Sequence, residues 1–167
     1  MDNSADWNTW LSEHGPTMLL LVRQWVSNRA DSEDIVQEAF VRFWKSRHRA
    51  VDPKAYLYVC AKRYLLEWLR TEERRGRREQ SVARVRPSVS TTLFKRLAAR
   101  EDHRRLESSL VALPAEQREI VILRIWGGLS FPQISEALAI PLNTASSRYR
   151  YALATLRKKL VEESIHD

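Results

Sequence analysis

The sequence predicts an all-α protein of two small helical domains joined by a flexible linker, the second domain carrying a helix-turn-helix. Apolar residues recur at helical spacing on both sides of one segment rich in Arg, Ser and Thr, no segment alternates with the period of a strand, and the chain has only 4 Gly. With 167 residues, 44% of them hydrophobic, the chain is long and apolar enough to form real cores.

The charge and the cysteine content narrow the class of protein. There are 28 Lys and Arg against 21 Asp and Glu, a net charge of +7, which favours a nucleic acid or an acidic protein surface as partner. The single Cys60 excludes an internal disulfide framework and fits a reduced, cytoplasmic location. No apolar run reaches the roughly 20 residues that span a bilayer, so we expect no membrane insertion.

The first half divides into helices at its turn signals. We expect one helix over residues 6–13, broken at Gly15-Pro16, and a second over 17–28. A third is expected from Asp31-Ser32 to Ser46, and a fourth opens with Asp52 as N-cap and Pro53 at the first position and runs past Arg70. The predicted domains are residues 1–75 and 93–167, with 76–92 as linker and a helical pattern that resumes near Leu93.

The second half contains a helix-turn-helix. Pro114 can open one helix, and Gly127-Gly128 can end it with a left-handed cap. Ser130 and Gln133 have the spacing of a capping box, and a tight turn at Ala139 would place an alanine in the left-handed region. These lengths together fit the motif that places its second helix in the major groove of DNA.

The last helix is basic. Between Ala137 and Val161 there is no Asp or Glu, and the five basic residues are Arg148, Arg150, Arg157, Lys158 and Lys159. Such a helix repels itself unless phosphates neutralise it, which predicts DNA binding. The alternative is a pair of helices with a solvated basic face.

Two faces of the N-terminal helices carry further candidates. On the third helix Ile35, Ala39 and Phe43 form an apolar stripe expected in the core, beside a polar face. On the fourth helix the expected buried face comprises Leu57, Cys60, Ala61, Tyr64, Leu65 and Trp68, and a second face comprises Tyr56, Val59, Arg63, Glu67 and Arg70. Aromatic and cationic groups on one exposed face suit unpaired bases. The alternative is a solvated surface with ion pairs from Glu67 to Arg63 and Arg70.

Three segments in order resemble one family. DSEDIVQEAFVRFW at 31–44, AYLYVCAKRYLLEWLR at 55–70 and the helix-turn-helix LPAEQREIVILRIWGGLSFPQISEALAIPLNTASSRYRYALATLRKKL at 113–160 resemble the extracytoplasmic-function (ECF) group of bacterial RNA polymerase sigma factors, in the sigma-70 family. The resemblance implies a sigma factor that directs core polymerase to promoters and starts transcription, and that is not an enzyme. Its two domains would be held apart by the linker so that both engage DNA at once.

The resemblance also implies site residues and partners. Asp34, Gln37 and Glu38 would bind the β′ clamp helices of core RNA polymerase, and the β flap is a second expected contact. The residues implied for the minus-ten element are Arg47, His48, Arg49, Tyr56, Arg63, Glu67 and Arg70. Those implied for the minus-thirty-five element are Asn143, Thr144, Ser146, Ser147, Arg148, Arg150 and Tyr151. The other implied partners are promoter DNA and an anti-sigma factor.

Two other functions remain open from the residues alone. One is a stand-alone, dimeric helix-turn-helix regulator that reads palindromic half-sites. The other is a nucleic-acid-processing enzyme that uses the acidic cluster of the third helix. A metal site of Asp31, Asp34 and Glu38 lacks a nearby His or a fourth ligand, so we expect no metal and no cofactor.

Overall fold

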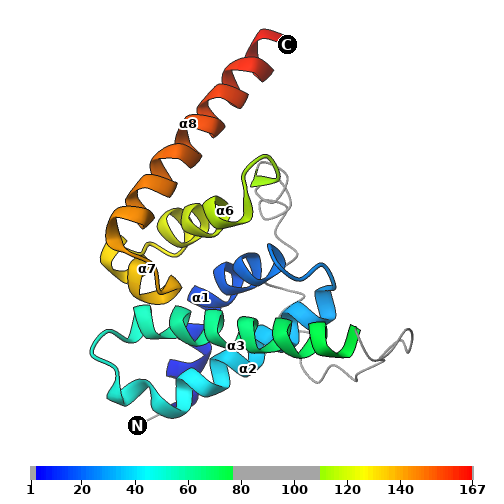
Figure 1. Ribbon diagram of the computed structural model, residues 1–167. Coiled ribbons are helices and arrows are strands. Elements are labelled where there is room, and N and C mark those ends of the chain that lie inside the picture. The colour runs from blue at the N-terminus through cyan, green and yellow to red at the C-terminus, as the bar shows by residue number, and fades with distance from the viewer. Residues whose placement is uncertain (1–2, 77–109, 167) are drawn as a thin grey trace.

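The structure is a computed structural model that describes residues 3–76 and 110–166. In these ranges every regular element is helical (Figure 1), which confirms the all-α prediction. The elements are α1 (Asn3–Arg23), α2 (Arg29–Ser46), η1 (Arg47–Arg49), α3 (Pro53–Gly76), α6 (Ala115–Val121), η2 (Ile122–Trp126), α7 (Phe131–Leu138) and α8 (Leu142–His166). The predicted linker after Gly76 and the helical pattern expected from Leu93 to residue 109 lie outside the described residues.

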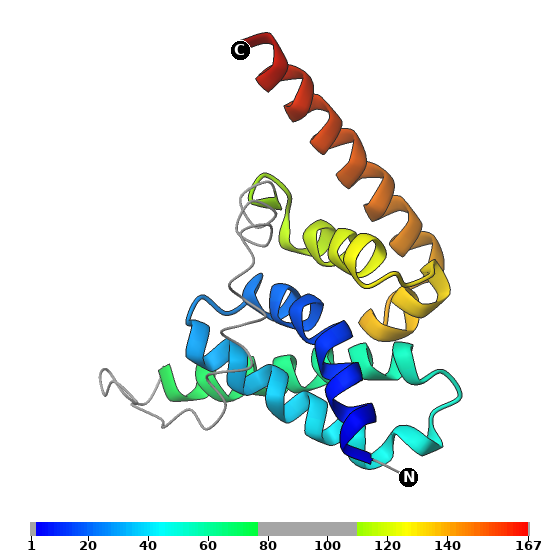
Figure 2. The same cartoon turned by 180° about the vertical axis from the view of Figure 1, so that it is seen from behind.

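The prediction of a break at Gly15-Pro16 is wrong, because α1 continues through Pro16. A proline inside a helix removes one hydrogen bond and costs about 3 kcal/mol. Both halves of α1 compensate for this by burying apolar side chains in one core, with Leu11 at 5% exposure before the proline and Met18 at 0% after it. Figure 2 shows that α1 changes direction along its length, as a proline in a helix commonly causes.

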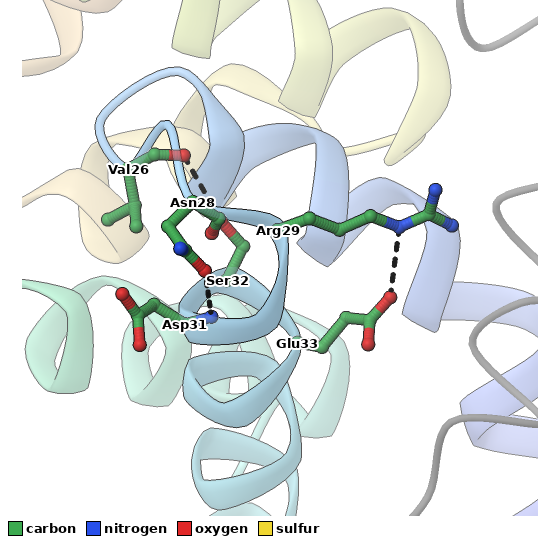
Figure 3. A network of polar contacts seen from close by, with 6 residues as sticks. All are labelled: Val26, Asn28, Arg29, Asp31, Ser32 and Glu33. Atoms are coloured by element: carbon green, nitrogen blue, oxygen red, sulfur yellow. Dashed lines mark hydrogen bonds and ion pairs between the residues drawn. The ribbon is translucent and has the colours of Figure 1, made fainter. Parts of the chain in front are cut away.

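The start of α2 is fixed by an N-cap, and the helix begins at Arg29, two residues before the start near Asp31 that the sequence predicts. Asn28 is the N-cap, and its side chain accepts a hydrogen bond from the Asp31 amide at 3.0 Å (Figure 3). The Ser32 hydroxyl donates to the carbonyl oxygens of Val26 and Asn28 at 3.1 and 2.9 Å. These bonds satisfy polar groups at the turn between α1 and α2, so the direction in which α2 leaves is set locally.

Helices α2 and α3 pack on α1 and form the core of the first half. The predicted stripe of Ile35, Ala39 and Phe43 is confirmed, since all three are at 0% exposure. At the start of α3 the predicted cap is also confirmed, because Asp52 Oδ1 accepts the amide of Ala55 at 3.0 Å. Of the six residues expected on the buried face of α3, Leu57, Cys60, Ala61 and Leu65 are buried, while Tyr64 and Trp68 are half-buried.

The end of η2 depends on two glycines. The helix widens to a π-helical turn, and the Gly127 amide donates to the Ile122 carbonyl at 3.0 Å. A Cβ at Gly127 would lie 2.6 Å from the carbonyl oxygen of Leu123, so a side chain cannot be placed there without moving the backbone. Gly128 has φ +63, which confirms the predicted left-handed cap.

The two halves lie against each other in this structure. Helix α7 packs on α3 and the π-helical turn η2 packs on α1, so that a single apolar cluster runs from Leu11 to Ala152 (Figures 1 and 2). The prediction that the linker holds the two halves apart is therefore wrong for this structure, because the halves are in contact. The far end of α8 projects beyond both halves. None of the described helices is long and apolar enough to cross a membrane.

A buried histidine makes the stability of the first half dependent on pH. The His14 ring is buried with Nδ1 3.3 Å from the Tyr58 hydroxyl oxygen, and burial lowers the pKa of His14 below 6.5. The unfolded chain therefore takes up a proton before the folded one does, and stability falls as the pH drops below 6.5. Between about pH 7.5 and 5.5, we expect the free energy of unfolding in urea to fall less for His14→Gln than for the wild type. The difference between the two slopes should be at most about 1.4 kcal/mol per pH unit. The same substitution at the exposed His48, which removes an imidazole outside the core, is the control.

Candidate nucleic-acid interface

The helix-turn-helix is fixed by hydrogen bonds between residues that lie close together in the chain. The Ser130 hydroxyl accepts the Gln133 amide at 3.3 Å and Gln133 Oε1 accepts the Ser130 amide at 2.8 Å, which confirms the predicted capping box. Ala139 adopts φ 53 and ψ 47, the left-handed conformation expected of the turn, at a cost of about 1–2 kcal/mol. The Ile140 amide closes the turn by donating to the Ser135 carbonyl at 3.1 Å. The angle between α7 and α8 is therefore fixed.

One side of α8 is buried and the opposite side faces outward. Ala145 and Ala152 are at 0% exposure, and their small side chains let α8 approach the helices beneath it closely. On the opposite side Asn143, Ser147 and Arg150 follow one another at i, i+4 and i+7, so they share one stripe. Asn143 and Arg150 are exposed and Ser147 is half-buried. An amide, a hydroxyl and a guanidinium on one face of a basic helix can read base edges in a major groove.

The other residues expected at the minus-thirty-five element lie beside this stripe. Thr144 and Ser146 are half-buried, and the Ser146 hydroxyl donates to the Leu142 carbonyl at 3.2 Å. Tyr151 is 61% exposed, with the Arg150 guanidinium 5.8 Å from its ring centroid. Arg148 is half-buried and attracts the carboxylate of Glu119, so Arg148 and Arg150 point to different sides of α8.

The residues expected at the minus-ten element fall into two groups on α3. Arg63, Glu67 and Arg70 are exposed, so this stretch is open to a ligand. Tyr56 is half-buried, and its hydroxyl lies 2.8 Å from the Ser46 hydroxyl at the end of α2. Val59 does not belong to the exposed face on which the period placed it, because it is 6% exposed.

The connection between α2 and α3 presents the remaining minus-ten candidates. Arg47 is half-buried, with its guanidinium 3.5 Å from the centroid of the Trp44 ring, and it donates to the Trp44 carbonyl. His48 and Arg49 are exposed, and Val51 is fully exposed. A loop with one anchored and one exposed arginine beside an exposed apolar side chain can contact both the phosphates and the faces of unpaired bases.

The residues expected to bind polymerase lie on the outer side of α2. Asp34, Gln37 and Glu38 are all half-buried, so none is withdrawn into the core. By contrast Glu33, one position earlier, is only 8% exposed and pairs with Arg29 at 3.1 Å (Figure 3). The acidic surface that remains available on α2 is therefore centred on Asp34 and Glu38.

Arg42 links this acidic surface to the exposed face of α3, and sequence reasoning missed it. Its guanidinium pairs with Glu38 at 3.4 Å and with Glu67 at 2.9 Å, and it lies 4.4 Å from the centroid of the Tyr64 ring. The sequence offered Arg63 and Arg70 of α3 as ion-pair partners of Glu67, whereas the structure pairs Glu67 with Arg42 of α2. The spacing of Glu38 and Arg42, four residues apart, could have indicated the first pair but not the second.

The contact between the halves contains a buried ion pair that sequence reasoning also missed. Lys62 Nζ on α3 lies 2.7 Å from Glu119 Oε2 on α6, with side-chain exposures of 11% and 5%. Trp25 Nε1 donates to the same carboxylate oxygen at 3.3 Å, and the Lys62 ammonium lies 4.5 Å from the Trp25 ring centroid. The sequence held one indication, since Lys62 follows directly on the apolar run from Leu57 to Ala61.

Burial dominates the electrostatics of Glu119. It raises the pKa of this carboxyl, while Lys62 and the Trp25 indole oppose the rise. Asp52, on the rim of the same contact, behaves in the opposite way, because its hydrogen bond from Gln133 lowers its pKa. Among the residues of 3–76 and 110–166, no group of three or more His, Cys, Asp and Glu could hold a metal ion.

Comparison with known proteins identifies the family to which these surfaces belong. Residues 10–75 match the family model "Sigma-70 region 2", and residues 103–156 match "Sigma-70, region 4". The chain is 30% identical over 145 residues to the ECF RNA polymerase sigma factor SigK of Mycobacterium tuberculosis, covering 84% of this chain and 78% of that protein. SigK of Mycobacterium ulcerans is similar to the same extent.

Two solved structures share the fold. The sigma factor RpoE of Bartonella quintana, in complex with the anti-sigma factor NepR, superposes with a TM-score of 0.66 at 21% identity, over 93% of this chain and 96% of that one. CnrH, in complex with the cytosolic domain of CnrY, gives a TM-score of 0.60 at 22% identity, over 96% of this chain and 91% of that one.

The chain belongs to the ECF RNA polymerase sigma factors of the sigma-70 family. It is a factor that directs RNA polymerase to promoters, and the implied partners, core polymerase and promoter DNA, follow from that membership. The alternative of a stand-alone dimeric regulator is not favoured, because both sigma regions are matched in one chain. Sigma factors are initiation factors and not enzymes.

Proposed function

We propose that this chain distributes the work of a sigma factor over three surfaces. In this proposal residues 1–75 form the domain that binds core polymerase and melts the minus-ten element, and residues 93–167 form the domain that reads the minus-thirty-five element, with 76–92 as the linker. The match of region 2 to residues 10–75 and of region 4 to residues 103–156 supports these limits. The chain would act in the cytoplasm and have no catalytic activity of its own.

The polymerase surface is the acidic side of α2, around Asp34, Gln37 and Glu38. The carboxylates of Asp34 and Glu38 are half-buried, so they can pair with basic groups of a partner while the core of the first half stays intact. The β′ clamp helices are the expected partner, and the β flap would meet the second domain.

The minus-thirty-five surface is the outward stripe of α8, and this stripe is the observation that carries the proposal for the second domain. Asn143, Ser147 and Arg150 would face the base edges. Thr144, Ser146, Arg148 and Tyr151 lie beside them and would reach the sugar-phosphate backbone.

An anti-sigma factor is a further proposed partner. One of the two similar structures is a complex of the sigma factor RpoE with the anti-sigma factor NepR, and the other is a complex of CnrH with the cytosolic domain of CnrY. Co-purification of this chain with core RNA polymerase, followed by transcription from a promoter selected from a randomised library, tests the whole proposal. Failure to bind core polymerase would overturn it.

The minus-ten surface comprises Arg47, His48 and Arg49 of η1 together with Tyr56, Arg63, Glu67 and Arg70 of α3. We expect Tyr56→Ala to impair formation of the open complex by about 1–3 kcal/mol while closed-complex binding stays near wild type, because bases can stack only after they separate. Permanganate footprinting measures opening and a gel shift on ice measures closed binding.

Tyr56→Phe is the matched control for this prediction. It keeps the ring and removes only the hydroxyl that meets Ser46, so opening should remain close to wild type. Equal losses of opening and closed binding in Tyr56→Ala would instead give Tyr56 a structural role.

A further inference from the structure

One carboxylate lies among the cations on the exposed face of α3. This face is a single stripe, because its members follow one another at i, i+4, i+7 and i+11, and all four are exposed: Arg63, Glu67, Arg70 and Arg74. Cations on such a stripe can hold the phosphates of a single strand, whereas a phosphate repels a carboxylate. Glu67 is therefore unsuited to a backbone contact, and beside unpaired bases it can only accept hydrogen bonds from their amino and imino groups.

Arg42 of α2 reaches across to this carboxylate. Helices α2 and α3 lie side by side (Figures 1 and 2), and Arg42 Nη1 donates to Glu67 Oε2 at 2.9 Å. Arg42 is also held on two other sides, by Glu38 Oε1 at 3.4 Å and by the ring of Tyr64, whose centroid lies 4.4 Å from the guanidinium carbon. The position of the Arg42 guanidinium is thus set by both helices.

The pair of Arg42 and Glu67 adds little to the stability of the fold. The two side chains are 45% and 54% exposed, and solvent and salt screen an ion pair that is this exposed. What the pair changes is the number of acceptors that Glu67 offers. Arg42 occupies Oε2, and no donor from residues 3–76 and 110–166 meets Oε1. One oxygen of the carboxylate therefore remains for a donor from outside the chain.

A carboxylate with one open oxygen suits some unpaired bases better than others. Cytosine and adenine each present one exocyclic amino group beside a ring nitrogen that accepts, so one oxygen is enough for either. Guanine presents an imino and an amino donor side by side, and only two oxygens can meet both; with one oxygen, a donor is left without a partner at a cost in free energy. Thymine places a carbonyl oxygen on each side of its single donor, and these repel a carboxylate.

We propose that Arg42 is a specificity-determining residue of the minus-ten surface, which occupies one oxygen of Glu67 and so makes Glu67 select an unpaired cytosine or adenine against guanine. Arg42 acts through Glu67 and is thus a positioning residue. The proposal rests on the minus-ten role proposed above for Glu67. It gives α2, whose acidic side is the proposed polymerase surface, a part in reading the promoter.

The test compares the base preference of holoenzymes that carry the full chain with Arg42→Met or with the wild-type residue. Methionine keeps an unbranched side chain beside Tyr64 but donates no hydrogen bond, so both oxygens of Glu67 become available. Each holoenzyme, formed with saturating core polymerase, selects from single-stranded DNA with a randomised minus-ten element. We expect guanine to be enriched about tenfold at one position in Arg42→Met relative to the wild type, because a bidentate contact to a base discriminates by roughly that factor.

Three further variants show whether the change depends on the pair. Arg42→Lys keeps a cation beside Glu67 and should keep the preference of the wild type. Adding Glu67→Ala to Arg42→Met should abolish the gain of guanine, because no carboxylate remains to accept. Lys45→Met removes the same charge from another exposed position of α2 and should leave the base preference unchanged. Circular dichroism checks the fold of each variant.

The outcomes separate this proposal from the minus-ten role of Glu67. An unchanged base preference in Arg42→Met, or a gain of guanine that persists in the double variant, would overturn the role of Arg42 while Glu67 could still belong to the surface. If Glu67→Ala alone bound single-stranded DNA with the affinity and the base preference of the wild type, the minus-ten role of Glu67 itself would be wrong.

Discussion

The double substitution Asp34→Lys with Glu38→Lys should weaken binding to core RNA polymerase by about 2–5 kcal/mol while the helical fold is retained. Both side chains are half-buried on the outer side of α2, and the core residues of that helix, such as Ile35 and Ala39, lie on its other side. Reversing the charges replaces attraction to a basic partner by repulsion. A fluorescence titration with core polymerase measures the loss, and circular dichroism checks the fold.

Glu38 also pairs with Arg42, so a substitution at Glu38 changes an ion pair within the chain as well as the polymerase surface. Glu38→Lys also repels Arg42, which would remain paired with Glu67 at 2.9 Å. Asp34→Lys alone disturbs no ion pair among residues 3–76 and 110–166, and it should by itself cause a large part of the loss. Asp6→Lys with Glu13→Lys makes the same charge change at exposed positions on α1 and should have little effect. Wild-type affinity in the Asp34 and Glu38 variant would exclude this surface from polymerase binding.

Arg150→Ala is expected to cost about 1–3 kcal/mol at the selected minus-thirty-five element and to relax base preference at one position. The reason is the place of Arg150 on the outward stripe of α8, with Ser147 one turn and Asn143 two turns before it. Selection of a randomised minus-thirty-five library by the variant holoenzyme measures the preference.

Arg157→Ala provides the matched comparison for Arg150. It removes the same charge from an exposed position two turns further along α8, where we expect contact with phosphates only. This variant should bind all sequences somewhat more weakly, with a shallower dependence on salt and the base preference of the wild type. A preference that shifts in Arg157→Ala and not in Arg150→Ala would reverse the two assignments.

Much of the fold could be predicted because the determinants are local. The capping box of Ser130 and Gln133, the cap at Asp52 and the left-handed Gly128 each depend on a few neighbouring residues, and all three are confirmed. The apolar stripe of α2 follows from helical period alone and is likewise confirmed. Pro16 was misjudged because its local cost is exceeded by burial on both sides of it, which a local rule does not include.

For the candidate site the sequence indicated residue types and helix faces, but not their partners. Helical period separated Arg148 from Arg150, and the structure places them on different sides of α8. The roles at polymerase and promoter remain predictions. Helical period also put Val59 on the exposed face of α3, where it is buried, since α3 packs against α7 in addition to α1 and α2.

The sequence by itself determined the helices, their caps and the order of the motifs, because these depend on residues a few positions apart. Only the tertiary structure decided that Lys62 meets Glu119, that Arg42 joins Glu38 to Glu67, and that Asp52 reaches Gln133. The last contact joins residues 81 positions apart in the chain. Such contacts follow from how two helical surfaces dock, and docking is determined by the shape and charge of the whole surface, which no local pattern in the sequence encodes.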